Sequence, residues 1–337
     1  MGCAAALALR ERGVRTLLLE RAVPGAEASS AAAGILGGQC ESRGPGPLAD
    51  ALLASRAKYA EWVTNLVSRT AIDVGYRVCG VLRVGDDASA QDDMTVEWQT
   101  KAGLRVEVLS GARAREIEPA LSPEIKRATY FPDDGQVDPP RLLRALMTAC
   151  VKADVEIRSG TTVERLSIES GRCVGVEANA ERISSDAVVL AAGSWSSLVP
   201  GWPSGVPRVI PARGQMVLLD ERAPRARTIV FHKSIYVVPR GDGRVVLGST
   251  LEFAGYRKEV TAGGVAGILA GAIDAMPSLS SAELSATWSN FRPYVECAMP
   301  LVGASETPGL FLATGHHRNG ILLAPWTADR VVASMGL

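Results

Sequence analysis

The sequence predicts a mixed α/β fold, in which a parallel-sheet unit and an antiparallel-sheet unit are interleaved. Three observations support this prediction. First, 337 residues suffice for about two domains. Second, short and wholly apolar runs recur near the start, the middle and the end of the chain, which is typical of buried parallel strands. Third, runs that alternate between apolar and polar residues fill the gaps, as in antiparallel strands. We therefore expect the chain to cross between the two units several times.

The first two predicted elements are a helix followed by a strand. Residues 2–12 are rich in Ala and Leu and stop before Gly13, which predicts a helix with a glycine stop. Residues 14–20 (VRTLLLE) form a continuous apolar run closed by an acid, which predicts a buried parallel strand. A loop of small residues over 28–38 comes next, and the apolar spacing over 48–69 predicts a helix.

The middle of the chain alternates between strands and one helix. We expect strands over residues 76–84, 105–109, 155–158 and 187–192, and a helix over residues 141–152. Residues 163–177 predict a hairpin, because Glu169, Ser170 and Gly171 form a turn signal. The apolar strand over 187–192 should end at Gly193.

The last third repeats both strand types. Alternating strands are expected over residues 209–219, 228–238 and 244–251, followed by a helix over 265–276. An apolar strand over 310–314, a turn over 315–320 and a helix over 321–335 complete the chain.

Composition excludes several classes of protein. The charges balance, with 36 Lys and Arg against 36 Asp and Glu, which argues against a nucleic-acid or membrane-surface binder. The six Cys are far apart with no CxxC pair, so we expect free thiols in the cytoplasm. We expect no metal site, because only three His are present. No run of about 20 apolar residues predicts a membrane span.

The first motif is a helix that opens on Gly2 and a strand that ends at Glu20. In a dinucleotide-binding βαβ unit, the third glycine allows close packing of helix on strand, and an acid about 20 residues on binds ribose hydroxyls. Since the sequence starts inside this motif, we expect an N-terminal strand and its glycine loop, together roughly 15 residues, to be missing. Alternatively, a small-residue helix before a strand is a common packing unit.

Two loops have the composition of ligand-binding segments. In residues 29–36 (SSAAAGIL), small side chains would let a flat ring and a pyrophosphate approach the backbone. Residues 315–325 (GHHRNGILLAP) lie between a strand and a helix, where amides stabilise negative charge. The alternatives are a flexible surface loop and an ordinary strand–turn–helix connection.

The last feature is a pair of residues on the antiparallel part, Tyr236 and Arg292. An Arg can hold a carboxylate in a two-point fork, and a Tyr hydroxyl can add a third hydrogen bond. Taken singly, a strand Tyr is more often a packing residue, and an Arg is more often a solvated surface charge.

In their order along the chain, these features resemble the glycine oxidase branch of the D-amino acid oxidase family, whose members are FAD flavoproteins linked to thiamine biosynthesis. The resemblance rests on the runs SSAAAGILG, YVVPR with VVLGSTL, FRP and GHHRNGILLAP, and covers essentially the whole chain. It implies a Rossmann-like FAD-binding domain over residues 1–75, 133–205 and 294–337. It also implies a substrate-binding domain over residues 76–132 and 206–293.

The resemblance assigns roles to particular residues. It implies that Glu20 binds the adenosine ribose, that Val163 meets the adenine, and that Arg292 clamps the substrate carboxylate with help from Tyr236. Arg318 would lie close to both substrate and flavin. Cofactor contacts are implied for Met1, Gly2, Glu20, Arg21, Ala28, Ser29, Ala33, Gly34, Ile35, Val163, Gly193, His316, His317, Arg318, Asn319, Gly320, Ile321 and Leu322.

The implied reaction is oxidative deamination of glycine, sarcosine or a small D-amino acid to the 2-oxo acid, with O2 reduced to hydrogen peroxide. A homotetramer is implied as well. Two alternatives stay open: a D-amino acid dehydrogenase that uses a quinone, and a truncated, non-catalytic flavoprotein. The chain departs from its relatives at His317, where an aromatic residue is common, and at Leu251, where a Met can occur.

Overall fold

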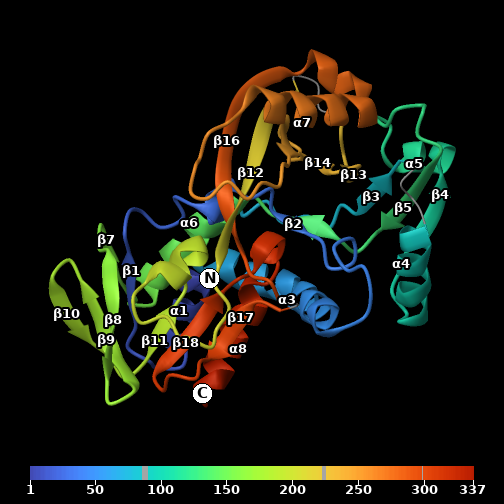
Figure 1. The fold of residues 1–337 in the computed structure, drawn as a ribbon. Helices are drawn as coiled ribbons and strands as arrows, with labels where there is room; N and C mark the ends of the chain where they lie inside the picture. The colour runs from blue at the N-terminus through green and yellow to red at the C-terminus, as the bar shows by residue number, and fades with distance from the viewer. Residues whose placement is uncertain (86–89, 222–224, 298) are drawn as a thin grey trace.

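Parallel pairings are central to one part of the molecule, while the largest sheet is built mostly, though not wholly, of antiparallel pairings (Figure 1). The computed structural model describes residues 1–85, 90–221, 225–297 and 299–337. We call the part built around the parallel strands the parallel-strand region, and the largest sheet the eight-stranded sheet. The prediction of a mixed α/β fold is confirmed.

The parallel-strand region contains two separate parallel pairs. β1 (Leu17–Glu20) pairs with β7 (Glu156–Ser159), and β11 (Val188–Leu190) pairs with β18 (Leu310–Thr314). β17 (Leu301–Ala304) lies antiparallel to β18. These strands confirm the apolar runs near both ends and in the middle. β1 is only half-buried, because its leucines line a cavity instead of packing against a neighbouring strand on both sides.

Long helices cover this region close to their predicted positions. They are α1 (Gly2–Arg10), α3 (Pro47–Thr70), α6 (Pro139–Lys152) and α8 (Ala324–Ser334). α1 contacts α6 and α8, and their shared core includes the fully buried Leu52 and Tyr59 of α3. α6 starts where Asp138 accepts a hydrogen bond from the amide of Arg141, with a proline in the first turn, a strong start signal.

A small antiparallel sheet projects beside the parallel strands. It consists of β8 (Val163–Glu169), β9 (Arg172–Ala178) and β10 (Glu181–Ser184). The predicted hairpin is confirmed, and its turn places Ser170 and Gly171 in the left-handed region, with φ of 47° and 77°. The third strand, β10, was not expected from the sequence.

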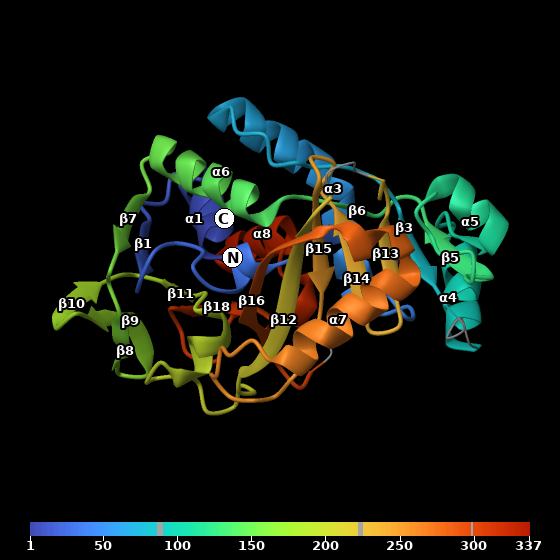
Figure 2. The ribbon, with the colours of Figure 1, turned by 90° about the horizontal axis from the view of Figure 1, so that it is seen from above.

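The eight-stranded sheet has the order β16-β12-β15-β14-β13-β3-β5-β4. Its members are β3 (Val81–Val84), β4 (Glu107–Ser110), β5 (Arg127–Phe131), β12 (Ile210–Asp220), β13 (Ile229–His232), β14 (Ile235–Pro239), β15 (Arg244–Gly248) and β16 (Glu283–Tyr294). The predicted helix near 265–276 is α7 (Ala262–Ala275), which packs across this sheet over β12 to β15 (Figure 2). The sheet and α7 share one hydrophobic cluster.

Two expectations about local structure were wrong. The single strand over 228–238 is a hairpin of β13 and β14, because Lys233 adopts a φ of 53° and reverses the chain so that His232 pairs with Ile235. The loop over 28–38 contains a short helix, α2 (Ala28–Ala31), and a short strand, β2 (Ile35–Leu36), which pairs with β6 (Gly135–Gln136).

Several elements have no clear signal in the sequence. The sequence prediction lacks α4 (Ala90–Lys101), α5 (Gly111–Ile117), β5, β6, β10, β16, β17 and the 3₁₀ helices η1 (Gly193–Leu198), η2 (Pro277–Ser281) and η3 (His317–Asn319). The most consequential is β16, whose first five residues are all exposed at the edge of the sheet. An exposed edge strand needs no alternation of apolar and polar residues, so the period-2 signal is absent.

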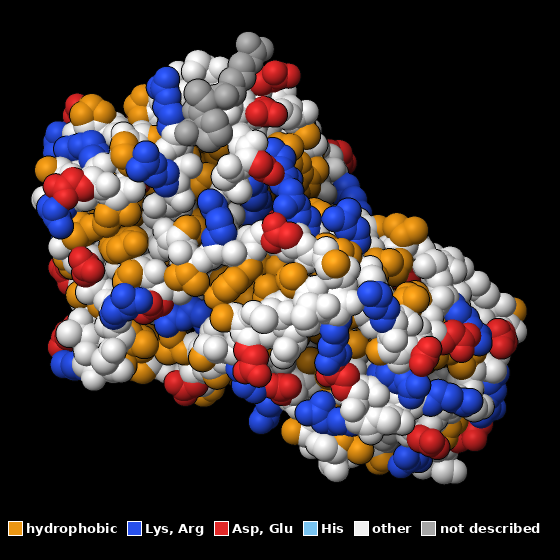
Figure 3. Space-filling model, turned by 180° about the vertical axis from the view of Figure 1, so that it is seen from behind, with side chains coloured by type: hydrophobic (Ala, Val, Ile, Leu, Met, Phe, Trp, Pro, Cys, Tyr) orange, Lys and Arg blue, Asp and Glu red, His pale blue; other side chains and the backbone are white. Residues whose placement is uncertain are grey.

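The surface agrees with the balanced composition. In the view from behind, Lys and Arg are interspersed with Asp and Glu over the face shown (Figure 3). Of the helices in the described residues, none combines the length and apolar character needed to cross a bilayer.

Candidate active site

A cavity of about 1760 Å³ runs between the parallel-strand region and the eight-stranded sheet. It collects nearly all of the residues that the sequence singled out. Met1, Gly2, Glu20, Arg21, Ala28, Ser29, Ala33, Gly34, Ile35, Val163, Gly193, Tyr236, Arg292 and the turn residues from His316 to Ile321 all line it. Leu322 does not, because its side chain is buried in the core and its carbonyl accepts a hydrogen bond from Ser55 at 2.6 Å. We call the part near β1 the β1 end and the part near Arg292 the sheet end.

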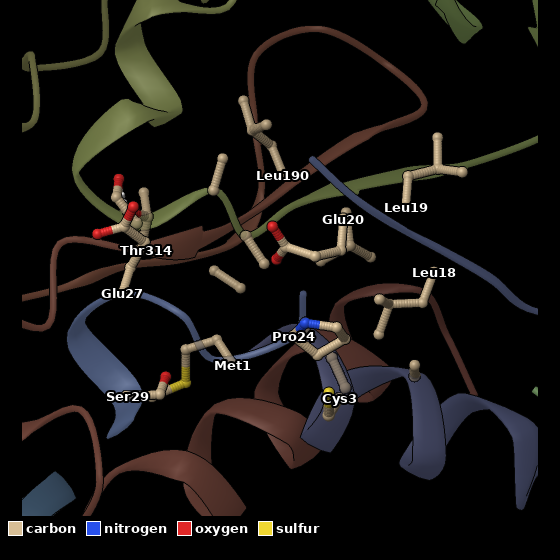
Figure 4. A pocket seen from close by; sticks show the side chains of 18 of the residues that line it. Met1, Cys3, Leu18, Leu19, Glu20, Pro24, Glu27, Ser29, Leu190 and Thr314 are labelled. Atoms are coloured by element: carbon tan, nitrogen blue, oxygen red, sulfur yellow. Dashed lines mark hydrogen bonds between the residues drawn. The ribbon is translucent and has the colours of Figure 1, made fainter. Parts of the chain in front are cut away.

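Glu20 closes β1 with an acceptor that is only partly used. One carboxylate oxygen accepts the amide of Ala22 at 2.9 Å, and no cationic side chain in the described part of the chain pairs with it. Figure 4 shows this carboxylate pointing from β1 into the cavity. The position at the carboxyl end of a parallel strand is the one from which an acid reaches ribose hydroxyls.

Arg21, next to Glu20, is held by two partners. Its guanidinium donates to Glu27 at 2.8 Å and lies 4.0 Å from the ring centroid of Trp195. Glu27 also pairs with Lys258, from the segment after β15. Trp195 lines the cavity and was not predicted as a site residue, since an isolated Trp after a Gly-Ser turn has no distinctive signature.

The loop of small residues around Gly34 is held in place through hydrogen bonds of its backbone. Gly34 has a φ of 74°, and a Cβ atom there would lie 2.2 Å from the carbonyl oxygen of Val137. The carbonyl of the preceding Ala33 accepts from Arg240 at 2.7 Å, and the carbonyl of Gly34 accepts from the amide of Val137 at 2.9 Å. The left-handed backbone and the close carbonyl together require glycine at this position, and the loop is held against β6 and β14.

At the same end, Gly193 begins η1 with a φ of 54°, and a Cβ atom would meet nothing within 4 Å. Its carbonyl accepts from Thr314 at 3.0 Å, which ties the end of β11 to the end of β18. Val163 stands at the start of β8 on the cavity wall, as the sequence analysis placed it.

The turn after β18 is held in place by hydrogen bonds from two helices, α3 and α8. Tyr59 on α3 donates its hydroxyl to the carbonyl of Ile321 at 3.1 Å. His316 is buried and contacts the hydroxyl of Thr327 through Nε2 at 2.8 Å. Burial lowers the pKa of His316 to about 3, so this imidazole is neutral at pH 7.

His317 sits between two guanidinium groups. Burial, together with the positive charges of Arg292 and Arg318, lowers its pKa to about 4. Its ring packs edge-on against Tyr294, with centroids 5.2 Å apart. The Nε2 atom of His317 is buried without a hydrogen-bond partner among the described residues. Arg318 donates to Glu41 at 2.8 Å, and this charge raises the pKa of Arg318.

The sheet end brings together residues from three strands. Arg292 on β16 donates through Nη2 to the hydroxyl of Ser249 at 2.6 Å and through Nη1 to the carbonyl of Thr250 at 3.2 Å. Its guanidinium crosses β12 over Gly214, where a Cβ atom would lie 2.2 Å from Nη2. Tyr236 on β14 is buried, and its hydroxyl reaches the sulfur of Met216 at 3.3 Å.

Sequence reasoning missed three residues here: Gly214, Ser249 and Glu41, all of which line the cavity. Ser249 lies 43 residues before Arg292, and Gly214 lies on a strand that looks uniform from its alternation alone. The glycine inside the predicted strand over 209–219 is a signal that could have been used, since such a glycine often marks a close approach.

Comparison with known proteins gives a consistent result. The DAO family model, described as FAD dependent oxidoreductase, matches residues 1–334. The chain is 34% identical to the glycine oxidase of Geobacillus kaustophilus over 97% of its length and 88% of the relative. A crystal structure of glycine oxidase from that organism superposes with a TM-score of 0.94 at 33% identity, covering 99% of this chain and 91% of the other.

A second kind of relative is longer. The chain is 34% identical to the bifunctional protein ThiO/ThiG of a Nostoc species, over 97% of this chain. It covers 50% of that relative, so the chain spans about half the length of the bifunctional proteins that it matches.

Proposed function

The chain belongs to the DAO family of FAD dependent oxidoreductases, and on that premise we propose that it oxidises a small α-amino acid such as glycine. The observation that carries this proposal is the sheet end of the cavity. Arg292, a fixed guanidinium with unused donors, faces the same cavity as the turn that contains His317 and Arg318. A fixed guanidinium is suited to hold a carboxylate, and glycine is the substrate named for the relatives that the chain matches over most of their length.

The cavity fits FAD. Gly34 brings its backbone to the wall at a position with no room for a Cβ atom, Glu20 has free acceptor capacity, and the buried Nε2 of His317 has no hydrogen-bond partner among the described residues. Glu20 would bind the ribose, and the amides at the start of α1 and the loop at Gly34 would meet the pyrophosphate. When bound, FAD accepts two electrons from the substrate and delivers them to O2.

In the proposed mechanism, the residues of the protein orient the substrate and favour the neutral form of its amine. Arg292, helped by Tyr236, would hold the carboxylate and so fix the α-carbon in the cavity. Oxidation of the amine requires its neutral form, and the guanidinium groups of Arg292 and Arg318 lower the pKa of an ammonium group near them. His316 and His317 are neutral at pH 7, so neither adds a charge of its own to this part of the cavity.

The remaining assignments are part of the same proposal. We assign the FAD-binding domain to residues 1–75, 133–205 and 294–337 and the substrate-binding domain to residues 76–132 and 206–293. Separate hydrophobic clusters around α1, α3 and α6 and around α7 support this division. We also propose that the enzyme works in the cytoplasm as a homotetramer and serves thiamine biosynthesis.

The test uses purified protein with its flavin. Anaerobic addition of glycine should bleach the visible flavin spectrum, and readmission of air should restore the colour with release of one peroxide per turnover. D-Alanine and sarcosine are the comparison substrates. If the reduced flavin is reoxidised slowly by O2 but rapidly by a quinone, the enzyme is a dehydrogenase and not an oxidase. A chain that binds no flavin, or whose flavin none of these amines reduces, would overturn the proposal.

A further inference from the structure

The hydroxyl of Ser249 stands beside Arg292 at the sheet end of the cavity, on the segment that follows β15. We propose that Ser249 is a substrate-binding residue that donates a hydrogen bond to the same carboxylate as Arg292. This inference rests on the proposed function, because it refines how that site recognises its substrate. It identifies the ligand class as a free carboxylate that takes donors from both a guanidinium and a hydroxyl.

The direction of the Ser249 hydroxyl follows from its partner. A guanidinium has five N–H donors and no acceptor, so in the 2.6 Å contact Nη2 of Arg292 must donate and Oγ of Ser249 must accept. The hydroxyl proton of Ser249 then points elsewhere. In the described ranges, no protein acceptor receives it, while the residue lines the cavity. A donor is therefore left directed toward a ligand.

The backbone around Ser249 is held in place on both sides. Thr250 accepts the amide of Gln215 at 2.9 Å and donates its hydroxyl to Glu252. Glu252 also accepts from Gln215 at 2.8 Å and pairs with Arg213. Because these bonds tie the segment to β12, the Ser249 hydroxyl keeps its position without a bound ligand.

Arg292 is positioned by the same segment. Nη1 donates to the carbonyl of Thr250, and the bare backbone at Gly214 allows the guanidinium to lie close to β12. These two bonds use only part of the donors of Arg292, which leaves others for a carboxylate. Ser249 and Arg292 thus form one two-residue binding group, with Arg292 supplying the charge and Ser249 a further donor.

The expected kinetic effect follows from the chemistry of the carboxylate. This group carries the same charge before and after oxidation at the α-carbon, so a bond to it stabilises substrate and transition state equally. Loss of the Ser249 hydroxyl should therefore raise KM while leaving kcat almost unchanged. A purely structural role would lower kcat or the flavin content instead.

The experiment compares wild-type holoenzyme with Ser249→Ala and Ser249→Cys, the second replacing the hydroxyl by a poor donor of similar size. We expect KM for glycine to rise about tenfold in both variants, as for one lost hydrogen bond to a charged group. Affinity for acetate, a carboxylate without an amine, should fall by the same factor when followed by the flavin absorbance. Ser305→Ala is the control, since that half-buried hydroxyl donates to Thr307 outside the cavity.

Two outcomes overturn the inference: unchanged acetate affinity in both Ser249 variants, or an equal loss in Ser305→Ala. Failure of the proposed function gives a different result, namely wild-type enzyme that does not oxidise glycine. In that case acetate binding still decides the role of Ser249. If Ser249→Ala does not fold, Ser249→Cys gives the same comparison.

Discussion

The two ends of the cavity are built on different principles. At the β1 end, the leucines of β1 and the acid Glu20 line the wall together with residues that bring the main chain to the surface through positive φ angles, such as Gly34 and Gly193. At the sheet end, the wall includes the charged side chain of Arg292, whose guanidinium donates to Ser249 and Thr250, and Thr250 in turn donates its hydroxyl to Glu252. The β1 end therefore depends on backbone shape, and the sheet end depends on charge.

This difference predicts different responses to substitution. Backbone shape is disturbed by an added methyl group and is insensitive to pH, whereas a charge network is disturbed by neutralisation and responds to pH. Glu20, the acid at the β1 end, keeps free acceptor capacity, whereas Glu252, three residues after Ser249 and outside the cavity lining, accepts from Thr250, Gln215 and Arg213. The four predictions below test this contrast.

The largest effect is expected for Arg292→Ala at the sheet end. Removal of the guanidinium should lower kcat/KM for glycine by roughly 30- to 5,000-fold, or about 2–5 kcal/mol, because a desolvated charge pair loses one partner. Steady-state kinetics on flavin-loaded enzyme measures this loss. Arg292→Lys should recover only part of it, since a lysine cannot form the fork. A near-normal kcat/KM in Arg292→Ala would remove this residue from the site.

At the β1 end, Gly34→Ala should cost about 2–3 kcal/mol of unfolding free energy. The φ of 74° disfavours any side chain, and the new Cβ would lie 2.2 Å from the carbonyl oxygen of Val137. Denaturant unfolding of the purified variant measures the loss. The matched control is Gly44→Ala, where a Cβ meets nothing within 4 Å and no left-handed backbone is required. Equal stability of the two variants would contradict a role for backbone shape.

Glu252→Gln should destabilise the protein by about 1–2 kcal/mol at pH 7, because the bond from Arg213 loses its ionic character. Partial burial alone would raise the pKa of Glu252, but bonds from Thr250, Arg213 and Gln215 outweigh it and lower the pKa to about 2. A depressed pKa adds stability above the ordinary value of 4.5, and this stability is lost as the pH falls toward 2.

The measurement for Glu252 is unfolding free energy at a series of pH values between 7 and about 2. The wild-type protein should lose more stability than Glu252→Gln on acidification, so the difference between them shrinks. Glu283→Gln serves as a control, because that carboxyl is exposed at the start of β16. A difference that stays constant with pH would show that the carboxylate charge is not what stabilises the segment.

The smallest effect is expected for Glu20→Gln, which keeps the shape of the acid and removes its charge. If Glu20 accepts from the ribose hydroxyls, FAD affinity should fall by about 1 kcal/mol, or roughly fivefold. Equilibrium titration of flavin-free protein with FAD measures this change. KM for glycine should stay the same, since Glu20 closes β1 whereas Arg292 lies on β16 of the eight-stranded sheet. A change in KM alone would argue that the two ends are not separate.

Sequence reasoning was most successful where local signals were strong. Gly13 marked the end of the first helix, and the Glu169 to Gly171 turn marked a hairpin, because these residues act on the backbone within a few positions. It failed for β16, an edge strand whose first five residues are all exposed. It also failed for the hairpin at Lys233, because the left-handed backbone there is adopted by a lysine and no glycine in the sequence signals the turn.

By itself, the sequence determined the fold class, the family resemblance and a set of candidate residues of which nearly all line the cavity, because motifs of small residues, Arg and Tyr carry their chemistry in residue type and order. Only the tertiary structure decided how Arg292 is held, since Ser249 and Gly214 approach it through strand register. It also decided that His317 is neutral, because burial and the charges of Arg292 and Arg318 act through space. Register and burial depend on contacts between distant segments, which residue order alone does not specify.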